Sequence, residues 1–393
     1  AGGGWGAPRE FDGRVFADPD GSLRVDFPDG VSWGFDAAGR IEVLTRWDGQ
    51  TVTVTRGGDG RVLTAVSSLG PSVSFAYEPS GAQRLVSVSS SDGRTVGYGY
   101  DPVSGFLSSV TDPSGRVTSF ETDSVGRVTK VIDGSGVVEV DNTYDSAGRV
   151  ASQVTPTGIV SFTYLADRTT EVSVALPGGG SETITYVHDE LGRLVGQEDQ
   201  FGHSTVRSYD SNGWIAADAS RSGVTEESER NEFGQPGSVT VPGEGTTTIE
   251  YSGGRVAAVD SPVSGVTMLT YGSAGDPNRV PRTVTDDAGK VTTNHVVNGL
   301  IEWSEDPDGV RTTFTYDLLR RVKTSTDELS RVTTLDYDSA GRLSRVETPE
   351  GRVTTREYDP AGRLRFERVG VQDPAAVAVT EYRYDAAGRL ELV

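Results

Sequence analysis

The sequence contains no cysteine, one methionine and three histidines in 393 residues. Without cysteine there are no disulfides, no thiolate metal sites and no cysteine nucleophiles. No apolar run approaches the ~18–20 residues that a membrane-spanning helix requires. Lysine and arginine total 36 against 57 aspartates and glutamates, which gives a formal net charge of -21. This charge repels phosphate backbones and therefore disfavours nucleic acid as a partner.

Glycine, by contrast, is in excess, with 50 residues where average usage would supply roughly 28. The same sequence contains a repeated motif, Tyr-Asp-x-x-Gly-Arg. Tyr316, Tyr337 and Tyr358 follow one another at intervals of 21 residues, and degenerate copies extend the series from about residue 30 to the end. The four best copies comprise Tyr144, Asp145, Gly148 and Arg149; Tyr337, Asp338, Gly341 and Arg342; Tyr358, Asp359, Gly362 and Arg363; and Tyr384, Asp385, Gly388 and Arg389.

A second turn signal lies midway between the Tyr-Asp motifs, as at residues 112–116 (DPSGR), 306–310 (DPDGV) and 348–352 (TPEGR). Proline presets its own φ and glycine accepts a positive φ, so both signals predict β-turns. The runs between turns are about seven residues long and rich in Val, Thr, Leu and Tyr, which predicts strands. Each repeat is therefore predicted to be one β-hairpin, with about 17 units and very little helix.

The predicted fold class is all-β, with tandem hairpin repeats forming one long antiparallel meander wound into a spiral hollow shell or barrel. At ~4.8 Å between strands, about 34 strands extend about 160 Å, and open twisted sheets of that length curl. A single closure would give a diameter near 50 Å, which is too wide for side chains to fill. The sequence therefore predicts a wall around a cavity.

Each residue of the motif has a predicted structural role in this wall. The tyrosine at the end of a strand is predicted to stack on the tyrosine one repeat along and to form an aromatic ladder. The aspartate is predicted to accept backbone N–H bonds from its turn and to pair with the arginine of the same motif. Aligned repeats would then carry a ladder of Asp–Arg pairs.

The motif and its spacing resemble the YD repeat of the Rhs family. That family includes bacterial polymorphic toxins, the C components of insecticidal toxin complexes and the teneurin cell-surface proteins. The resemblance implies a hollow β-shell that encloses a C-terminal toxin or forms an extracellular barrel, and a secreted or cell-surface location. On this basis we divide the chain into N-terminal lead-in strands or a cap over residues 1–29 and a tandem-repeat shell over residues 30–393.

The C-terminal part departs from the toxin-bearing members of that family, which end the shell with a D-P-x-G-L core segment and a self-cleavage site. Here residues 359–362 (DPAG) continue with Arg363 and another repeat at Tyr384. No self-cleavage residue is carried over from the resemblance. Because the chain also begins without an initiator methionine, we expect it to be a segment of a longer or processed protein.

Few residues in the sequence point to chemistry. His188 occupies a tyrosine position of the repeat, His203 follows a turn glycine and His295 lies in a strand-like run, and no two have metal-binding spacing. Acidic turns at residues 18–21 and 306–309 lack the oxygen set of a calcium loop and are interpreted as turn formers. Packing within the sheet, rather than the alternative of sugar stacking, is our interpretation of Trp5, Trp33, Trp47, Trp214 and Trp303.

The leading hypothesis is a non-enzymatic structural wall of a secreted or cell-surface bacterial protein, which encloses or presents a toxin or effector region outside this chain. Its partners would be its own C-terminal cargo or neighbouring shell segments. The alternative is a self-assembling or adhesive extracellular module, in which strand edges pair with another copy or aromatic side chains bind a cell-surface glycan. We expect no catalytic residue, no cofactor and no metal.

Overall fold

The computed structural model describes residues 13–27, 29–176, 178–231, 233–272, 279–370, 377–385 and 387–393. These residues form strands and turns and contain no helix, and hence none long and apolar enough to cross a membrane. The strands are β1 (Arg14–Ala17), β2 (Leu23–Asp26), β3 (Ser32–Phe35), β4 (Ile41–Thr45), β5 (Thr51–Arg56), β6 (Val62–Ser67), β7 (Ser72–Tyr77), β8 (Leu85–Ser90), β9 (Thr95–Tyr100), β10 (Leu107–Thr111), β11 (Val117–Thr122), β12 (Val128–Ile132), β13 (Val138–Tyr144), β14 (Val150–Thr155), β15 (Gly158–Tyr164), β16 (Thr169–Ala175), β17 (Ser181–His188), β18 (Leu194–Asp199), β19 (Ser204–Tyr209), β20 (Ile215–Ala219), β21 (Thr225–Arg230), β22 (Pro236–Val241), β23 (Gly245–Ser252), β24 (Arg255–Ser261), β25 (Gly265–Thr270), β26 (Thr283–Thr285), β27 (Val291–Val297), β28 (Leu300–Glu305), β29 (Arg311–Tyr316), β30 (Val322–Thr326), β31 (Val332–Tyr337), β32 (Leu343–Glu347), β33 (Val353–Tyr358), β34 (Leu364–Gly370), β35 (Ala378–Glu381), β36 (Arg383–Tyr384) and β37 (Leu390–Leu392).

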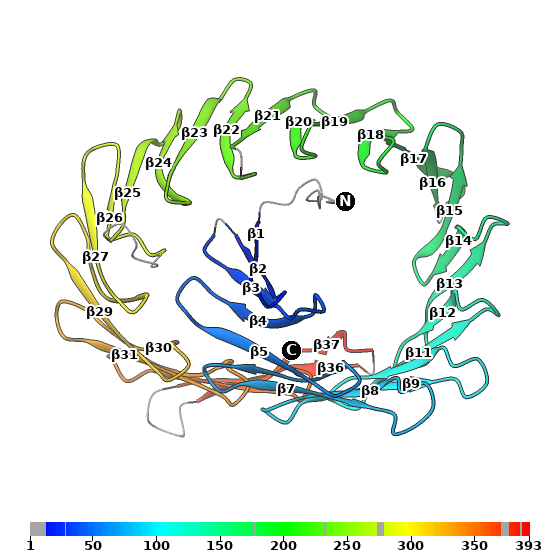
Figure 1. Ribbon diagram of the computed structural model, residues 1–393, viewed down its shortest axis with the longest axis horizontal. Coiled ribbons are helices and arrows are strands. Elements are labelled where there is room, and N and C mark those ends of the chain that lie inside the picture. The colour runs from blue at the N-terminus through cyan, green and yellow to red at the C-terminus, as the bar shows by residue number, and fades with distance from the viewer. Residues whose placement is uncertain are drawn as a thin grey trace.

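One antiparallel sheet of 35 strands, β1 to β35, makes up nearly all of the described chain. Each strand pairs with the next one in sequence, from β1 with β2 to β34 with β35, and the last two strands form a separate two-stranded sheet. The sheet curves into a ring, with β1–β4 inside its outline and with β7 and β31 along the same side (Figure 1). The predicted all-β meander of hairpins wound into a shell is confirmed.

Two kinds of turn alternate along the sheet and define its two edges. Turns of the Tyr-Asp type, such as 338–342 between β31 and β32, form the Tyr-Asp edge, and turns such as 348–352 between β32 and β33 form the opposite edge. In both turns the first residue donates its backbone N–H to the carbonyl of the fifth at 2.9 Å. The fourth residue is glycine with φ of 84° at Gly341 and 79° at Gly351, a conformation that favours glycine.

A β-bulge accompanies the Tyr-Asp turns. In the β31–β32 hairpin, Tyr337 pairs with Leu343 while Asp336 pairs with Arg345, which leaves Ser344 as the extra residue. The same shift in register lies beside Tyr144, Tyr209 and Tyr358. The β32–β33 hairpin at the opposite edge keeps its register unbroken. Because a bulge bends its strand and increases the twist, bulges concentrated at one edge favour winding of the sheet.

The wall has no conventional hydrophobic core. Among the described residues only Val25 and Val296 are buried apolar side chains. The accessible surface is 23073 Å², whereas a compact monomer of this size would expose about 14,900 Å². The additional area is what a single curved layer with solvent on both faces requires.

Candidate functional site

The aspartate and arginine of each motif hold the Tyr-Asp turn together. Asp338 Oδ1 accepts the backbone N–H groups of Ala340 at 3.0 Å and Arg342 at 2.9 Å, and Asp338 Oδ2 accepts a bond from Arg342 Nε at 2.7 Å. The same side-chain pair joins Asp145 to Arg149, Asp359 to Arg363 and Asp385 to Arg389. The Asp–Arg pairing expected from the sequence is therefore present in the four best motif copies.

Neighbouring repeats interlock through an arginine and a tyrosine. The Arg321 guanidinium lies 4.2 Å from the ring centre of Tyr337 in the next repeat, and the Tyr337 hydroxyl donates to the Val322 carbonyl at 2.9 Å. The same stacking joins Arg127 to Tyr144, Arg342 to Tyr358 and Arg363 to Tyr384. The predicted tyrosine ladder is wrong, since no ring contact between two tyrosines occurs among the described residues. The guanidinium covers the ring face that a second tyrosine would need.

The glycine of each Tyr-Asp turn leaves room for the arginine of the preceding repeat. A Cβ atom added to Gly341 would lie 3.3 Å from Arg321 Nη1. The corresponding distances are 3.3 Å for Gly148 to Arg127, 3.3 Å for Gly362 to Arg342 and 3.1 Å for Gly388 to Arg363. Phe106, which stands in an arginine position, fills the same space 2.8 Å from such a Cβ on Gly126. Glycine therefore serves both the turn geometry and the contact between repeats.

Alternation along the strands gives the wall two different faces. In β29, Thr312, Phe314 and Tyr316 are half-buried, whereas Thr313 and Thr315 are exposed. We call the face that carries the motif tyrosines the Tyr face and the other the hydroxyl face. Cross-strand hydroxyl pairs on the hydroxyl face, with oxygens 2.6 Å to 2.9 Å apart, are Thr55–Thr64, Ser89–Thr95, Thr143–Ser152, Ser173–Thr183, Thr240–Thr246, Thr270–Thr283 and Thr315–Thr324.

The Tyr face is the concave one. Arg24 belongs to the hydroxyl face of β2, because its neighbour Leu23 pairs with Phe35, which holds a tyrosine position of the repeat. Arg24 lines one cavity together with Leu269 and Tyr271 of the outer wall. Since β2 lies inside the outline of the ring (Figure 1), its hydroxyl face looks outward onto the Tyr face of the wall. The hydroxyl face is therefore the convex side.

The sheet winds past its own beginning, and the two passes meet along a seam of ion pairs. Arg320 of a Tyr-Asp turn reaches Asp48 in the β4–β5 turn at 3.5 Å. Arg389, in the last Tyr-Asp turn, reaches Asp133 at 3.6 Å and Glu139 at 3.3 Å. The two aspartate side chains are only 1% and 9% exposed. The Tyr-Asp edge of the later pass thus rests on the opposite edge of the earlier pass.

The seam contacts measure one circuit of the wall. From the β4–β5 turn to the β29–β30 turn is 25 strands, and from the β12–β13 turn to the β36–β37 turn is 24. At ~4.8 Å for each strand, one circuit is about 115 Å long and its diameter is at least about 37 Å, which strand tilt widens further. The chain therefore makes about one and a half circuits. The single closed circuit of about 160 Å suggested by the sequence alone is not what the structure shows.

Carboxylates along the seam are held in the charged form by hydrogen bonds. The Arg94 guanidinium lowers the pKa of Asp92 to about 2. Burial acts to raise the pKa of Asp112, but hydrogen bonds from Ser114 and Arg116 outweigh it and lower the pKa to about 2. The Ser135 hydroxyl lowers the pKa of Asp133 to about 2 as well, against the effect of burial. These three opposite-edge turns lie between β8 and β13, where the later pass covers them.

The structure does not assemble the histidines or acidic turns into a site. His203 contacts Asp199 at 3.1 Å, and His188 lies 3.3 Å from the Arg168 carbonyl. No group of three or more histidine, aspartate or glutamate side chains able to hold a metal occurs in the described part of the chain. Asp306 Oδ1 accepts the backbone N–H groups of Asp308 and Val310 at 2.9 Å each, as a turn former does.

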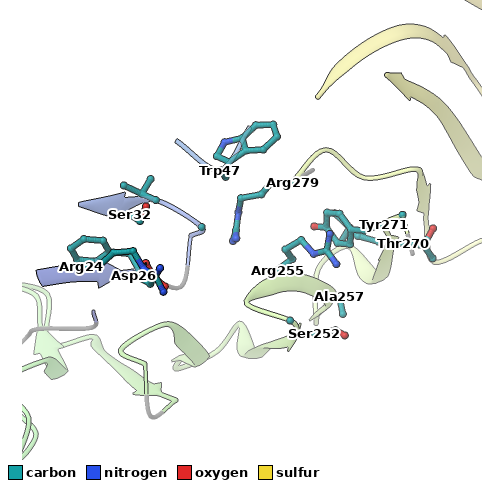
Figure 2. Close-up of a pocket in the computed structure, with 16 residues that line it drawn as sticks. Arg24, Asp26, Ser32, Trp47, Ser252, Arg255, Ala257, Thr270, Tyr271 and Arg279 are labelled. Carbon is teal, nitrogen blue, oxygen red and sulfur yellow. The ribbon is translucent and has the colours of Figure 1, made fainter. Parts of the chain in front are cut away.

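The tryptophans are dispersed along the wall. Trp33 packs edge-on against Phe27 at 4.8 Å, and Trp214 stands in an arginine position against Gly234. Trp303 lies between His295, stacked at 5.3 Å, and Arg311 at 3.9 Å, which leaves no free ring face for a sugar. Trp47 lines a large cavity (Figure 2). Trp5 lies outside the described residues.

Comparisons with known proteins agree with this geometry. A family model described as RHS Repeat matches residues 103–138, 320–353 and 337–378. No curated protein matches the chain. The crystal structure of TcdB2-TccC3-Cdc42 is similar over 96% of this chain and 22% of that chain, with a TM-score of 0.56 and 13% identity. For the Photorhabdus luminescens Tc holotoxin pore the coverage is 96% and 22%, the TM-score 0.36 and the identity 14%.

The fold and the interlocked motifs define a wall of tandem β-hairpin repeats. The repeats at residues 103–138, 320–353 and 337–378 match the RHS repeat, and the fold is similar to that in the crystal structure of TcdB2-TccC3-Cdc42. The resemblance noted in the sequence is thereby confirmed. The chain spans about a fifth of the length of the solved chains to which it is similar.

Proposed function

We propose that this chain is the non-enzymatic wall of a secreted bacterial shell, and that the wall encloses or presents a toxin or effector region outside the chain. The observation that supports the proposal is the hollow geometry. A single sheet of 35 strands passes its own beginning after 24 or 25 strands and seals against itself with ion pairs whose aspartates are nearly buried. A circuit of at least about 37 Å across is too wide for side chains to fill.

The contrast between the faces supports containment. The concave Tyr face carries half-buried aromatic and aliphatic side chains such as Phe314, Tyr316 and Val160. The convex hydroxyl face carries paired Thr and Ser hydroxyls, which suits contact with solvent. The neighbours in the structural comparison are toxin-complex proteins, and this also supports the proposal.

Containment is tested by protease protection. Figure 1 places the C-terminal end of the chain inside the outline of the ring. We therefore design a chain with an unstructured, protease-sensitive peptide fused after Val393, and a control with the same peptide inserted after Val263, whose side chain is 82% exposed in a turn. Cleavage at least tenfold slower for the fusion after Val393 would support enclosure. Equal cleavage rates in the two chains would overturn it.

A further inference from the structure

The ion pairs of the seam occupy only part of each edge of the wall. They join opposite-edge turns between β4 and β13 to Tyr-Asp turns between β29 and β37. We call the Tyr-Asp turns from β9–β10 to β17–β18 the outer Tyr-Asp edge, and the turns from β18–β19 to β30–β31 on the other side the outer opposite edge. The seam spans 8 strands and the outer opposite edge spans 12, so the uncovered edge is longer than the seam.

Two identical copies of the motif show what the seam covers. Residues 144–149 and 337–342 both have the sequence YDSAGR, and the first lies on the outer Tyr-Asp edge while the second lies in the seam beside Arg94. Ala147 is exposed, whereas the equivalent Ala340 is half-buried. The side chain of Arg149 is 51% exposed and that of the equivalent Arg342 only 27%. The second pass of the wall accounts for this difference, since the local sequences are the same.

The third residue of the turn is apolar and exposed along both outer edges. On the outer Tyr-Asp edge, Val125 and Leu191 hold this position and are 69% and 57% exposed. On the outer opposite edge, Phe201 and Leu329 hold it and are 75% and 66% exposed. In the seam the same position of an opposite-edge turn is Asp48, whose side chain is 1% exposed. Rows of exposed apolar side chains with charged neighbours are typical of protein contacts.

The outer edges also carry the charges that the seam pairs. The seam joins an arginine of a Tyr-Asp turn to a carboxylate of an opposite-edge turn. Arg149 and Arg168 on the outer Tyr-Asp edge have side chains 51% and 53% exposed, and Asp308 and Glu328 on the outer opposite edge are exposed. Arg389 pairs within its own turn and still reaches the other edge. A motif arginine can therefore make both contacts at once.

We propose that the wall stacks on a second copy of this chain, with the outer Tyr-Asp edge of one copy on the outer opposite edge of the next. The contact repeats the chemistry of the seam between molecules and runs through turns, not through the strand edges. Because the two edges differ, the contact is head-to-tail and copies add in an open tube. The proposal does not depend on a cargo, since both edges belong to this chain.

Sedimentation velocity of the purified chain from about 1 to about 100 μM measures the assembly, and species larger than the monomer should grow with concentration. Leu191→Asp disables one edge and Phe201→Asp the other, and each should weaken self-association at least about tenfold. An equimolar mixture of the two variants should form dimers and nothing larger, because each variant keeps one intact edge. The mixture thereby distinguishes head-to-tail stacking from pairing of like edges.

Val206→Asp is the matched control, because Val206 is 57% exposed, as Leu191 is, but lies in β19 on the hydroxyl face. This variant should assemble as the unmodified chain does. Circular dichroism checks that each variant folds, and Val125→Asp replaces Leu191→Asp if the latter does not. A chain that stays monomeric throughout, unchanged assembly in both edge variants, or a mixture without dimers would overturn the proposal.

Discussion

At the scale of the residue, each motif arginine links two repeats. Arg342 pairs with Asp338 in its own turn and stacks 4.5 Å from Tyr358 in the next repeat, where its Nη1 atom also approaches the glycine of that turn. One side chain therefore combines an ion pair, a cation–π contact and packing against Gly362. This combination explains why a glycine, an aspartate and a tyrosine recur together with the arginine.

A pair of glycine variants separates the two roles of glycine. Gly341 and Gly351 have similar positive φ values of 84° and 79°, but only a Cβ on Gly341 would meet another side chain, Arg321 at 3.3 Å. Gly351→Ala should cost about 1–2 kcal/mol through backbone strain alone. Gly341→Ala should cost about 1 kcal/mol more, because the Arg321 contact is also disturbed. Urea unfolding midpoints measure both changes, and equal losses would contradict the packing role.

At the scale of the element, bulges in the hairpins curve the sheet, and the turns hold the charged aspartates. Bulges lie beside the tyrosines on the Tyr-Asp edge, as between Asp336 and Tyr337, and the β32–β33 hairpin on the opposite edge has none. The asymmetry between the edges gives a physical reason for winding. The turn aspartates meanwhile replace water with backbone and side-chain donors, which stabilises their charged form.

Acid should destabilise the hairpins through these aspartates. Asp92, Asp112 and Asp133 have folded-state pKa values of about 2, below the ordinary 3.8. Their stabilising contribution is therefore fully present above about pH 4 and is lost as the pH falls toward 2. Circular dichroism of urea unfolding at pH 6, 4 and 2.5 measures the loss. Asp112→Asn should show a weaker dependence on pH over this range than the unmodified chain, and an identical dependence would contradict the assignment.

At the scale of the whole molecule, the seam joins two passes of one long sheet and so closes the wall. The contacts that seal it are ion pairs between residues far apart in sequence, such as Arg389 with Asp133 and Arg320 with Asp48, which are 256 and 272 positions apart. Because the aspartates are nearly inaccessible to solvent, these pairs are screened less by salt than exposed pairs are. The arginine side chains remain partly exposed, so each ion pair contributes only modestly to the free energy that holds the two passes together.

The seam contribution is testable with two similar arginines. Arg389 and Arg331 are 55% and 56% exposed and both pair with an aspartate in their own turn, but only Arg389 also contacts the other pass of the wall. Arg389→Ala should speed amide hydrogen exchange in β12 and β13 roughly two- to fivefold, and Arg331→Ala should leave it unchanged there. The effect should shrink in high salt. Unchanged exchange in Arg389→Ala would contradict the role of the seam.

The sequence predicts local structure far better than it predicts the seam. Repeated turn signals determine the hairpins, their order and the Asp–Arg pairing, since all of these depend on residues a few positions apart. The stacking partner of Tyr337 was predicted incorrectly, because the spacing of the motif does not reveal that Arg321 occupies the ring face. The partners of Arg389 could not be predicted, because the number of strands in one circuit depends on the twist accumulated over many hairpins. The cavity lined by Arg24 and Arg279 also depends on where the two passes meet, so it could not be predicted either.

The central claim is that the chain forms one hollow wall, and electron cryomicroscopy of the purified chain tests it most directly. A hollow wall predicts a ring in end-on view, with β1–β4 as a second layer inside part of the wall, solvent density in the rest of the interior, and a seam where the later pass meets the turns between β4 and β13. The accessible surface of 23073 Å² already exceeds the about 14,900 Å² of a compact monomer of this size and therefore argues against a solid particle. A solid particle with two sheets packed face to face, or an extended sheet that does not meet itself after 24 or 25 strands, would contradict it.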